Sequence, residues 1–186
     1  VRVYVMGEDA LTRKATDTEI LQMEAIVKES MISGGLGFAT STFEGHNGEN
    51  GVPMPSRLAD DKEMHSIIMA MSSFGRGIFM LTRGSSTSID KIQNWMKDSN
   101  RPAVVAALLH NPLSDNSTFK ILDDISKATD KGIEMWGQVS CRPLSMEFTM
   151  KSPYLFEGIY SWRPAMECVS LELYKKVLAD NNFRET

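Results

Sequence analysis

The sequence has little cysteine, and the two residues present, Cys141 and Cys168, narrow the classes of protein that fit it. Two cysteines are too few for the disulfide framework of a small secreted domain, and they lack the spacing of zinc ligands. We therefore predict two reduced thiols, as is typical of a cytoplasmic protein.

Long apolar runs are missing too. The longest, Ala103 to Leu109, is far shorter than the ~20 residues of a transmembrane helix, so no membrane partner is expected. The chain starts at Val1 without a charged-then-apolar targeting segment and stops abruptly after Phe183-Arg184-Glu185-Thr186. Both ends look cut, and processing, truncation for expression or a gene fragment would each explain them.

An excess of positive charge is also absent. The chain has 186 residues and a net charge of −4, and its lysines and arginines are scattered, so we expect no nucleic-acid partner. Its 42% hydrophobic and 24% charged residues are ordinary for a soluble globular protein. The length fits one domain with a sizeable core.

The common signatures of catalytic sites are missing as well. The sequence contains no phosphate-binding glycine loop of common spacing and no Gly-x-Ser-x-Gly elbow. Its three histidines, His46, His65 and His110, form neither a His-x-His nor a His-x-x-x-His pair. The sequence alone therefore shows no closed metal site.

Helical and strand-like patterns alternate along the chain. Two capping boxes, Thr16 with Glu19 and Asp60 with Glu63, predict helix starts, and Gly34-Gly35 predicts the end of the first helix. Further helices are predicted at 89–96, 119–128 and 170–180. Strands are predicted at 36–41, 77–81, 103–109 and 133–139, with a shorter one at 1–6, an irregular stretch at 43–58 and a turn at 111–116.

This alternation predicts an α/β fold with a parallel sheet, because short connections through helices join parallel strands. In such folds the chemistry lies where the strands end. The segments of interest are therefore Ser41–Arg57, Thr82–Ser88, His110–Asp115 and Ser140–Phe156.

Several side chains in these segments are candidates for binding. Arg83 and Arg142 follow predicted strands, where guanidinium groups would hold a substrate carboxylate. Their alternative role is structural, as arginines that tie down loop carbonyls or pair with a loop Asp or Glu. His46 in the long loop and His110 at a strand end are candidates for substrate or metal binding, against ordinary loop and strand-ending roles. His65 lies inside a predicted helix and is expected to be structural or to face solvent.

The chain also resembles a known family, the N-acyl-D-amino-acid deacylase group of the amidohydrolase superfamily. The resemblance is colinear over nearly the whole chain and is most specific in the segment 138–144. It is carried by Arg2-Val3-Tyr4-Val5-Met6-Gly7, Ala15-Thr16-Asp17 with Glu19-Ile20, Gly35-Leu36-Gly37-Phe38-Ala39-Thr40-Ser41, His46, Gly51-Val52-Pro53-Met54-Pro55, Gly75-Arg76-Gly77-Ile78-Phe79, Arg101-Pro102, Gln138-Val139-Ser140-Cys141-Arg142-Pro143-Leu144, Phe148-Thr149 and Trp162-Arg163-Pro164.

The resemblance implies part of a metal-dependent (β/α)8 TIM barrel, an internal fragment with about four βα units that resemble the fourth to seventh strands. Residues 1–15 would be a lead-in, 16–140 the βα units, and 141–186 an irregular proline- and aromatic-rich segment with a short helix. The family's His-x-His, cysteine ligand and catalytic aspartate would lie outside this chain. Zinc is the family's cofactor, but Thr82 takes the place of one metal-binding histidine and Ala107, or a neighbour within one residue, that of another. This segment is therefore expected to bind none.

The implied function is hydrolysis of non-peptide C–N bonds in small-molecule amides such as N-acyl-D-amino acids. On that reading, Arg83, Arg142, Ser140 and His46 line the substrate end of the barrel, and His110 is a weaker metal candidate. The alternative is a non-catalytic relative that serves binding or assembly. The isolated chain is expected to be inactive and to form a homo-oligomer through the open edges of its sheet.

Overall fold

The structure of the protein is a computed structural model that describes residues 1–48, 51–110, 116–143 and 145–185. The chain forms two compact units, one of Val1–Glu44 with Pro55–Leu144 and one of Gly45–Met54 with Ser145–Thr186. Residues 111–115, which hold most of the predicted turn and of the candidate segment after His110, lie outside the described residues.

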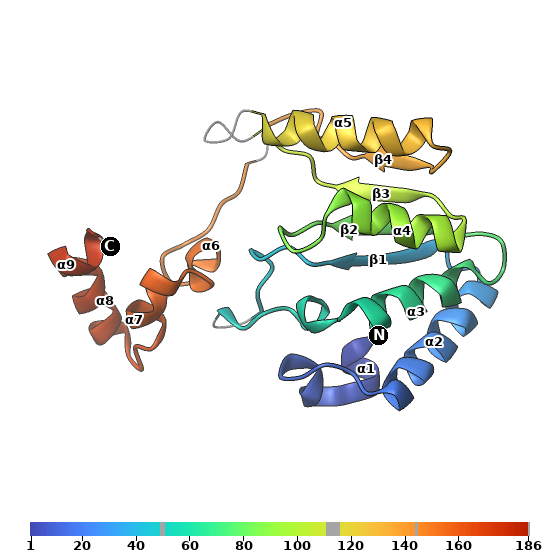
Figure 1. The fold of residues 1–186 in the computed structure, drawn as a ribbon. Helices are drawn as coiled ribbons and strands as arrows, with labels where there is room; N and C mark the ends of the chain where they lie inside the picture. The colour runs from blue at the N-terminus through green and yellow to red at the C-terminus, as the bar shows by residue number, and fades with distance from the viewer. Residues whose placement is uncertain (49–50, 111–115, 144, 186) are drawn as a thin grey trace. The chain divides into compact units, whose positions relative to one another are not determined.

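The first unit is built on a sheet of four parallel strands in the order β1-β2-β3-β4, which confirms the predicted parallel α/β sheet (Figure 1). In the register, Phe38 lies opposite Phe79, Phe79 opposite Ala103, and Ala103 opposite Met135. The strands are β1 (Gly37–Ser41), β2 (Ile78–Thr82), β3 (Ala103–Ala106) and β4 (Met135–Gly137).

The two faces of this sheet differ in burial. Phe79, Leu81 and Val105 point to one face and are fully buried. On the other face Ile78 is 47% exposed and Trp136 is 60% exposed. Since side chains alternate between the faces of a strand, helices cover one face and leave the other open among the described residues.

Helices α3, α4 and α5 follow one another along the sheet, in the order of the strands that they connect (Figure 1). They and α2, which packs against α3, supply apolar side chains to the core. Their bounds are α2 (Asp17–Ile32), α3 (Asp61–Ser72), α4 (Ile89–Ser99) and α5 (Ser117–Asp130). Among the buried apolar residues of α2, α3 and α4, these recur at helical spacing: Ile20, Met23, Val27, Met31, Met64, Ile67, Ile68, Met71, Ile89, Ile92, Trp95 and Met96.

The predicted helix starts are confirmed at α2 and partly at α3. Thr16 and Glu19 form both halves of the capping box, and the turn after the helix contains Gly34 with φ 103°, a conformation that favours glycine. At α3 the side chain of Asp60 accepts a hydrogen bond from the Glu63 amide, as the capping box predicts. The second predicted bond, from the Asp60 amide to the Glu63 side chain, is wrong. The Glu63 carboxylate pairs with Arg2 instead.

The predicted strand at 1–6 is wrong, because these residues form helix α1 (Arg2–Met6), followed by the 3-10 helix η1 (Gly7–Leu11). Arg2 and Met6 are the buried residues of α1, one helical turn apart, whereas Val3 and Tyr4 are exposed. The alternating pattern of the sequence misleads here, because a buried arginine belongs to the inward face.

Two strands are shorter than predicted, and one helix is less buried. Pairing ends at Ala106 in β3 and at Gly137 in β4, so Leu109 and Val139, predicted to lie in strands, are largely exposed. In α5 the buried residues are Ile125 and Ala128, whereas Phe119 and Leu122 in its N-terminal half are exposed.

The second unit is held by aromatic side chains. Phe156 contacts both Phe148 and Trp162, with ring centroids 5.5 and 4.7 Å apart, and Trp162 contacts Phe183 at 5.2 Å. The helix predicted at 170–180 is confirmed as α8. The elements are α6 (Tyr154–Glu157), η4 (Tyr160–Trp162), α7 (Arg163–Met166), α8 (Leu171–Ala179) and α9 (Asn181–Arg184).

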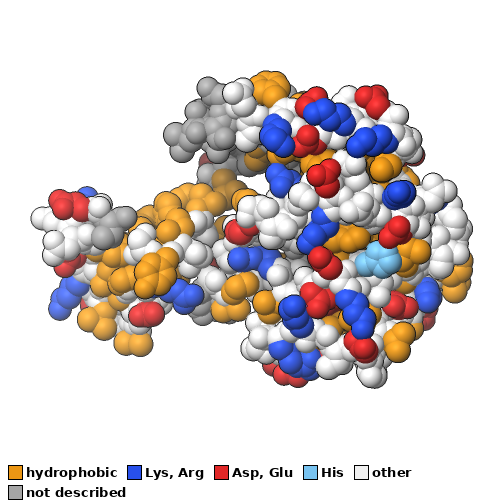
Figure 2. Space-filling view, viewed as in Figure 1, with side chains coloured by type: hydrophobic (Ala, Val, Ile, Leu, Met, Phe, Trp, Pro, Cys, Tyr) orange, Lys and Arg blue, Asp and Glu red, His pale blue; other side chains and the backbone are white. Residues whose placement is uncertain are grey.

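The surfaces of the two units differ in composition. Figure 2 shows hydrophobic side chains gathered over the elements of the second unit, whereas acidic and basic side chains are interspersed over the helices of the first. Among the described helices, none combines the length and the apolar character that a membrane crossing demands.

Candidate functional site

The carboxyl ends of the four strands form one edge of the sheet, where an α/β fold places its chemistry. Backbone hydrogen bonds continue the sheet just beyond the strands. The Thr42 amide donates to the Thr82 carbonyl at 3.0 Å, and the Arg83 amide donates to the Ala106 carbonyl at 3.2 Å. The Leu108 amide donates to the Gln138 carbonyl at 2.8 Å. The loops that leave this edge therefore start from fixed positions.

A compact polar cluster joins the ends of β1 and β2. The Thr42 hydroxyl accepts a hydrogen bond from the Gly84 amide at 3.0 Å and is bonded to the Thr87 hydroxyl at 3.0 Å. One carboxylate oxygen of Glu44 accepts from both the amide and the hydroxyl of Ser85, at 2.8 and 2.6 Å. The hydrogen bond from Ser85 holds the pKa of the Glu44 carboxyl below its usual value, so the group stays ionised.

The guanidinium of Arg83 belongs to the same loop. Its Nη1 donates to the carbonyls of Gly84 and Thr87 at 3.3 and 3.0 Å. This is the second of the two roles that the sequence leaves open for Arg83, an arginine that ties down loop carbonyls. The side chain is half-buried, and its orientation is set by the loop.

The ends of β3 and β4 border an open hollow of about 550 Å³. Among the predicted site residues, His110, Ser140 and Arg142 lie together here. The Ser140 hydroxyl is used within its own turn, donating to the Arg142 carbonyl at 2.6 Å and accepting from the Arg142 amide at 3.4 Å. The hollow is lined by Leu108, Leu109, His110, Ser140, Cys141, Arg142 and Pro143.

Arg142 presents its charge at this hollow. Its side chain is exposed, and within the described part of the chain its guanidinium makes no hydrogen bond or ion pair. The Ser140 turn fixes the backbone from which this side chain projects. Arg142 is therefore the site arginine whose donors are available to a carboxylate ligand.

The other two histidines lie elsewhere. His46 belongs to the second unit, where its carbonyl accepts from the Met54 amide at 3.2 Å. His65 lies in α3, with its Nε2 3.0 Å from a carboxylate oxygen of Asp98 in α4, and this pair is exposed.

The donor set at the strand ends does not fit a metal ion. Thr82 ends β2, Ala106 ends β3, and Ala107 follows, so these positions present a neutral hydroxyl and two methyl groups. Zinc in proteins takes histidine, cysteine and carboxylate ligands. Among residues 1–48, 51–110, 116–143 and 145–185, no group of three or more such side chains is arranged to hold an ion.

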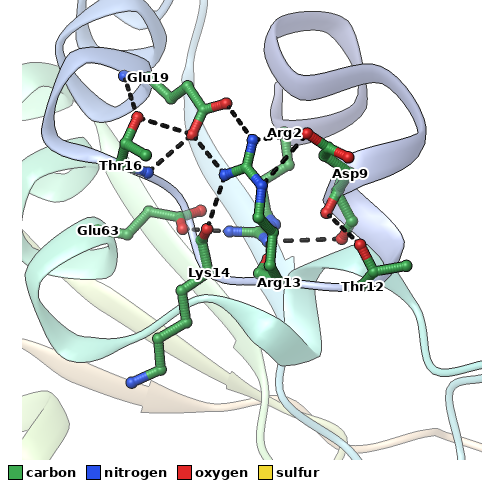
Figure 3. Close-up of polar contacts among 9 residues, drawn as sticks. Arg2, Asp9, Thr12, Arg13, Lys14, Thr16, Glu19 and Glu63 are labelled. Atoms are coloured by element: carbon green, nitrogen blue, oxygen red, sulfur yellow. Dashed lines mark hydrogen bonds and ion pairs between the residues drawn. The ribbon is translucent and has the colours of Figure 1, made fainter.

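A second polar network surrounds the start of α2 (Figure 3). The guanidinium of Arg13 lies between two carboxylates, 2.7 Å from an oxygen of Asp9 and 2.8 Å from an oxygen of Glu19. The hydrogen bond from Arg13, with others from Thr16, lowers the pKa of Glu19 to about 2. These groups are engaged with one another, which makes the network structural.

Sequence reasoning missed Thr42, Glu44 and Thr87 as members of the cluster between β1 and β2. The sequence offers little indication of this cluster, because Ser85-Ser86-Thr87-Ser88 is also typical of the residues that precede a helix. Only the register of β1 and β2, with Ser41 opposite Thr82, brings the two loops together.

The fold is similar to that of solved deacylases. The N-acyl-D-glutamate deacylase of Bordetella bronchiseptica, solved with zinc and a phosphonate mimic of the tetrahedral intermediate, matches with a TM-score of 0.61 and 16% identity, over 76% of this chain and 29% of its own. A D-aminoacylase described as defining a novel subset of amidohydrolases matches with a TM-score of 0.60 and 19% identity, over 77% and 28%. Another D-aminoacylase structure, described by its binuclear metal centre, matches equally well.

No protein-family model matches the chain, and no curated protein matches its sequence. The chain spans less than a third of the length of the solved proteins that it resembles. At this level of identity, what the likeness shows is a shared α/β fold with part of the amidohydrolases.

Proposed function

We propose that this chain is a partial (β/α)8 barrel, corresponding to the fourth to seventh strands of an N-acyl-D-amino-acid deacylase-like amidohydrolase. The observation that carries the proposal is the sheet itself. Its four strands are parallel and ordered as in the sequence, and they match the deacylase fold over about three-quarters of the chain. The activity proposed for the intact protein is hydrolysis of the C–N bond of a small amide.

In this proposal the chain contributes substrate binding. Arg142 holds the substrate carboxylate by charge-assisted hydrogen bonds at the hollow beside β3 and β4. Ser140 fixes the turn that carries it, and His110 borders the same hollow. Arg83 supports the neighbouring loop, and His46 remains a proposed substrate contact from the second unit.

A metal ion in the family's mechanism polarises the amide and activates water. The strand ends described here do not provide its ligands. Zinc in the intact protein would therefore depend on residues outside the described part of this chain, and the chain alone is proposed to be inactive.

The direct experiment is an assay of the intact protein that carries this chain, on a panel of N-acetyl-D-amino acids. We expect release of free D-amino acid that stops after treatment with a chelator and returns with zinc. A protein without hydrolysis across the panel would contradict the proposal.

The second candidate is a non-catalytic relative that serves binding or assembly. Thr82, Ala106 and Ala107 favour it, because they replace nitrogen donors with a hydroxyl and methyl groups. Metal analysis of the intact protein separates the two, since stoichiometric zinc supports the enzyme and its absence, together with an inactive panel, supports the relative.

We also propose that the isolated chain forms a homo-oligomer. Within the described residues the sheet has unpaired outer edges at β1 and β4 and an open face that includes Ile78 and Trp136. Such edges and faces pair readily with another copy.

A further inference from the structure

We propose that the end of the β1–β2 seam is a hydrogen-bonded clamp that takes the place of a metal site in this barrel. The clamp consists of Thr42 and Glu44 after β1 and of Gly84, Ser85 and Thr87 after β2. The inference rests on the proposed function for the comparison with metal-dependent deacylases, but its contacts are this chain's own.

The polar groups of the clamp form hydrogen bonds with one another. Thr87 is buried, with 3% of its surface exposed, and its hydroxyl bonds to the hydroxyl of Thr42. The Thr42 hydroxyl also accepts from the Gly84 amide. A buried hydroxyl without a hydrogen-bond partner destabilises a fold, so these contacts permit the burial of Thr87.

The loops that follow β1 and β2 approach each other closely at Gly84. A Cβ atom on Gly84 would lie 2.1 Å from the Thr42 carbonyl oxygen and 3.0 Å from a carboxylate oxygen of Glu44. Backbone occupies the space that a ligating side chain at position 84 would need. Only glycine fits there, whatever the chemistry of the neighbours.

The clamp contains a single charged group. Glu44 is the carboxylate of the cluster, and its bonded oxygen already accepts two hydrogen bonds from Ser85. Neutral hydroxyls and amides make up the rest of the clamp. One carboxylate does not make the set of three protein ligands that a catalytic zinc requires.

The clamp has a consequence for the loop between β2 and α4. Residues 83–88 are tied at Gly84, Ser85 and Thr87 to the end of β1 and internally by Arg83. The same loop ends at Ser88, whose side chain caps α4 by accepting from the Lys91 amide. The clamp thus fixes the end of β1, the loop after β2 and the start of α4 through hydrogen bonds alone.

The experiment uses the 186-residue chain and zinc chloride. Isothermal titration should show no stoichiometric zinc binding at micromolar concentrations. Amide hydrogen exchange should show Gly84 and Ser85 protected, because both amides are donors in the clamp. One equivalent of tightly bound zinc that is lost in Glu44→Gln, or exchange of both amides at the rate of a free loop, would overturn the proposal.

Variants test the cooperation of the two loops. Thr42→Val and Thr87→Val should each lower the thermal midpoint by about 2–4 °C, and the double variant should lose less than the sum. The matched control is Thr18→Val, an exposed threonine with no hydrogen bond from its side chain among the described residues, which should shift the midpoint little. Strict additivity of the pair would contradict the clamp.

The outcomes separate this inference from the proposed function. An intact protein that fails to hydrolyse any amide, while Gly84 and Ser85 are protected and the chain does not bind zinc, removes the hydrolase and leaves the clamp. An active hydrolase whose zinc depends on Glu44 removes the clamp and leaves the hydrolase.

Discussion

The guanidinium of Arg2 pairs with the carboxylate of Glu63 inside the protein, and the two side chains are 6% and 2% exposed. The pair joins α1 to the first turn of α3 across 61 residues of sequence. A second guanidinium nitrogen of Arg2 donates to the Arg13 carbonyl at 2.7 Å, which links the pair to the network at the start of α2 (Figure 3). Burial raises the pKa of Glu63, and the attraction of Arg2 opposes that rise.

Removing one member of this pair should destabilise the fold strongly. Arg2→Met leaves the Glu63 carboxylate buried without its partner, and we expect a loss of about 3–5 kcal/mol in the free energy of unfolding, measured with urea. The double variant Arg2→Met with Glu63→Met should recover most of the loss, because no charge is then left alone. A double variant as unstable as the single one would contradict this account.

Glu19 should make stability depend on acid pH. Its pKa in the folded protein is about 2, because Arg13 and Thr16 hydrogen-bond to its carboxylate, against an ordinary value of 4.5. An acid with a lowered pKa stabilises the fold above its unfolded pKa and loses that contribution as the pH falls toward its folded pKa. Glu19→Gln should therefore lower the thermal midpoint at pH 7, and the difference from the native protein should shrink between about pH 4.5 and 2.

The control for Glu19 is Glu8→Gln, which removes an exposed carboxylate with no side-chain hydrogen bond or ion pair among the described residues. It should leave the midpoint nearly unchanged at both ends of this range. A constant gap between the native protein and Glu19→Gln from pH 7 to pH 2 would show that the carboxylate charge is irrelevant.

Phe79 should be the most sensitive aromatic residue of the sheet. It is completely buried, stacks on Phe38 with centroids 6.3 Å apart and meets the edge of Trp95 at 6.0 Å. Phe79→Ala should cost about 3–5 kcal/mol in the free energy of unfolding by urea. The exposed Phe74 provides the control, since Phe74→Ala should cost less than about 1 kcal/mol. Similar losses for both would mean that the core does not lie between the sheet and α4.

Trp136 should control self-association of the isolated chain. It lies on the open face of β4, and a charge there would oppose burial against another copy. We expect the native chain to sediment as a dimer or higher oligomer and Trp136→Asp to shift it toward monomer. Tyr160→Asp, at an exposed aromatic residue of the second unit, should keep the native distribution. A native chain that is monomeric at all concentrations would refute the proposed oligomer.

Arg142 should affect substrate binding more than turnover. In the intact protein, Arg142→Ala should raise KM for an N-acyl-D-amino acid by about 10- to 100-fold with kcat nearly unchanged, because a carboxylate anchor acts on ground and transition states alike. Lys97→Ala removes a positive charge from the last turn of α4 and should leave KM unaltered. A fall in kcat at constant KM would assign Arg142 another role.

The sequence predicted the alternating elements because their signals are local. The capping box of Thr16 and Glu19 and the apolar stripe of α3 depend on residues within a few turns of each other. The parallel sheet followed from that alternation. Strand ends were less predictable, since the regular pairing of β3 stops at Ala106 although the residues beyond it remain apolar.

The candidate site was less accessible from sequence. The pattern located the strand ends and the two arginines, but it left open which guanidinium binds the protein itself. The Arg83 guanidinium donates to carbonyls of its own loop. In the turn at Arg142 it is the Ser140 hydroxyl that donates to the backbone. Glu63 was mispredicted for a similar reason. Its carboxylate pairs with Arg2, 61 residues away in the sequence, and not with the backbone at the start of its own helix.

The order of the strands in the sheet equals their order in the chain. During synthesis, each strand after β1 would leave the ribosome when the strand that it pairs with has already been synthesised. No later strand has to enter the sheet between two earlier strands. Pairing between consecutive strands keeps the sequence separation of the partners smaller than pairing between distant strands would, and folding slows as that separation grows. The first unit should therefore assemble from its amino end, one strand and helix at a time, as translation proceeds.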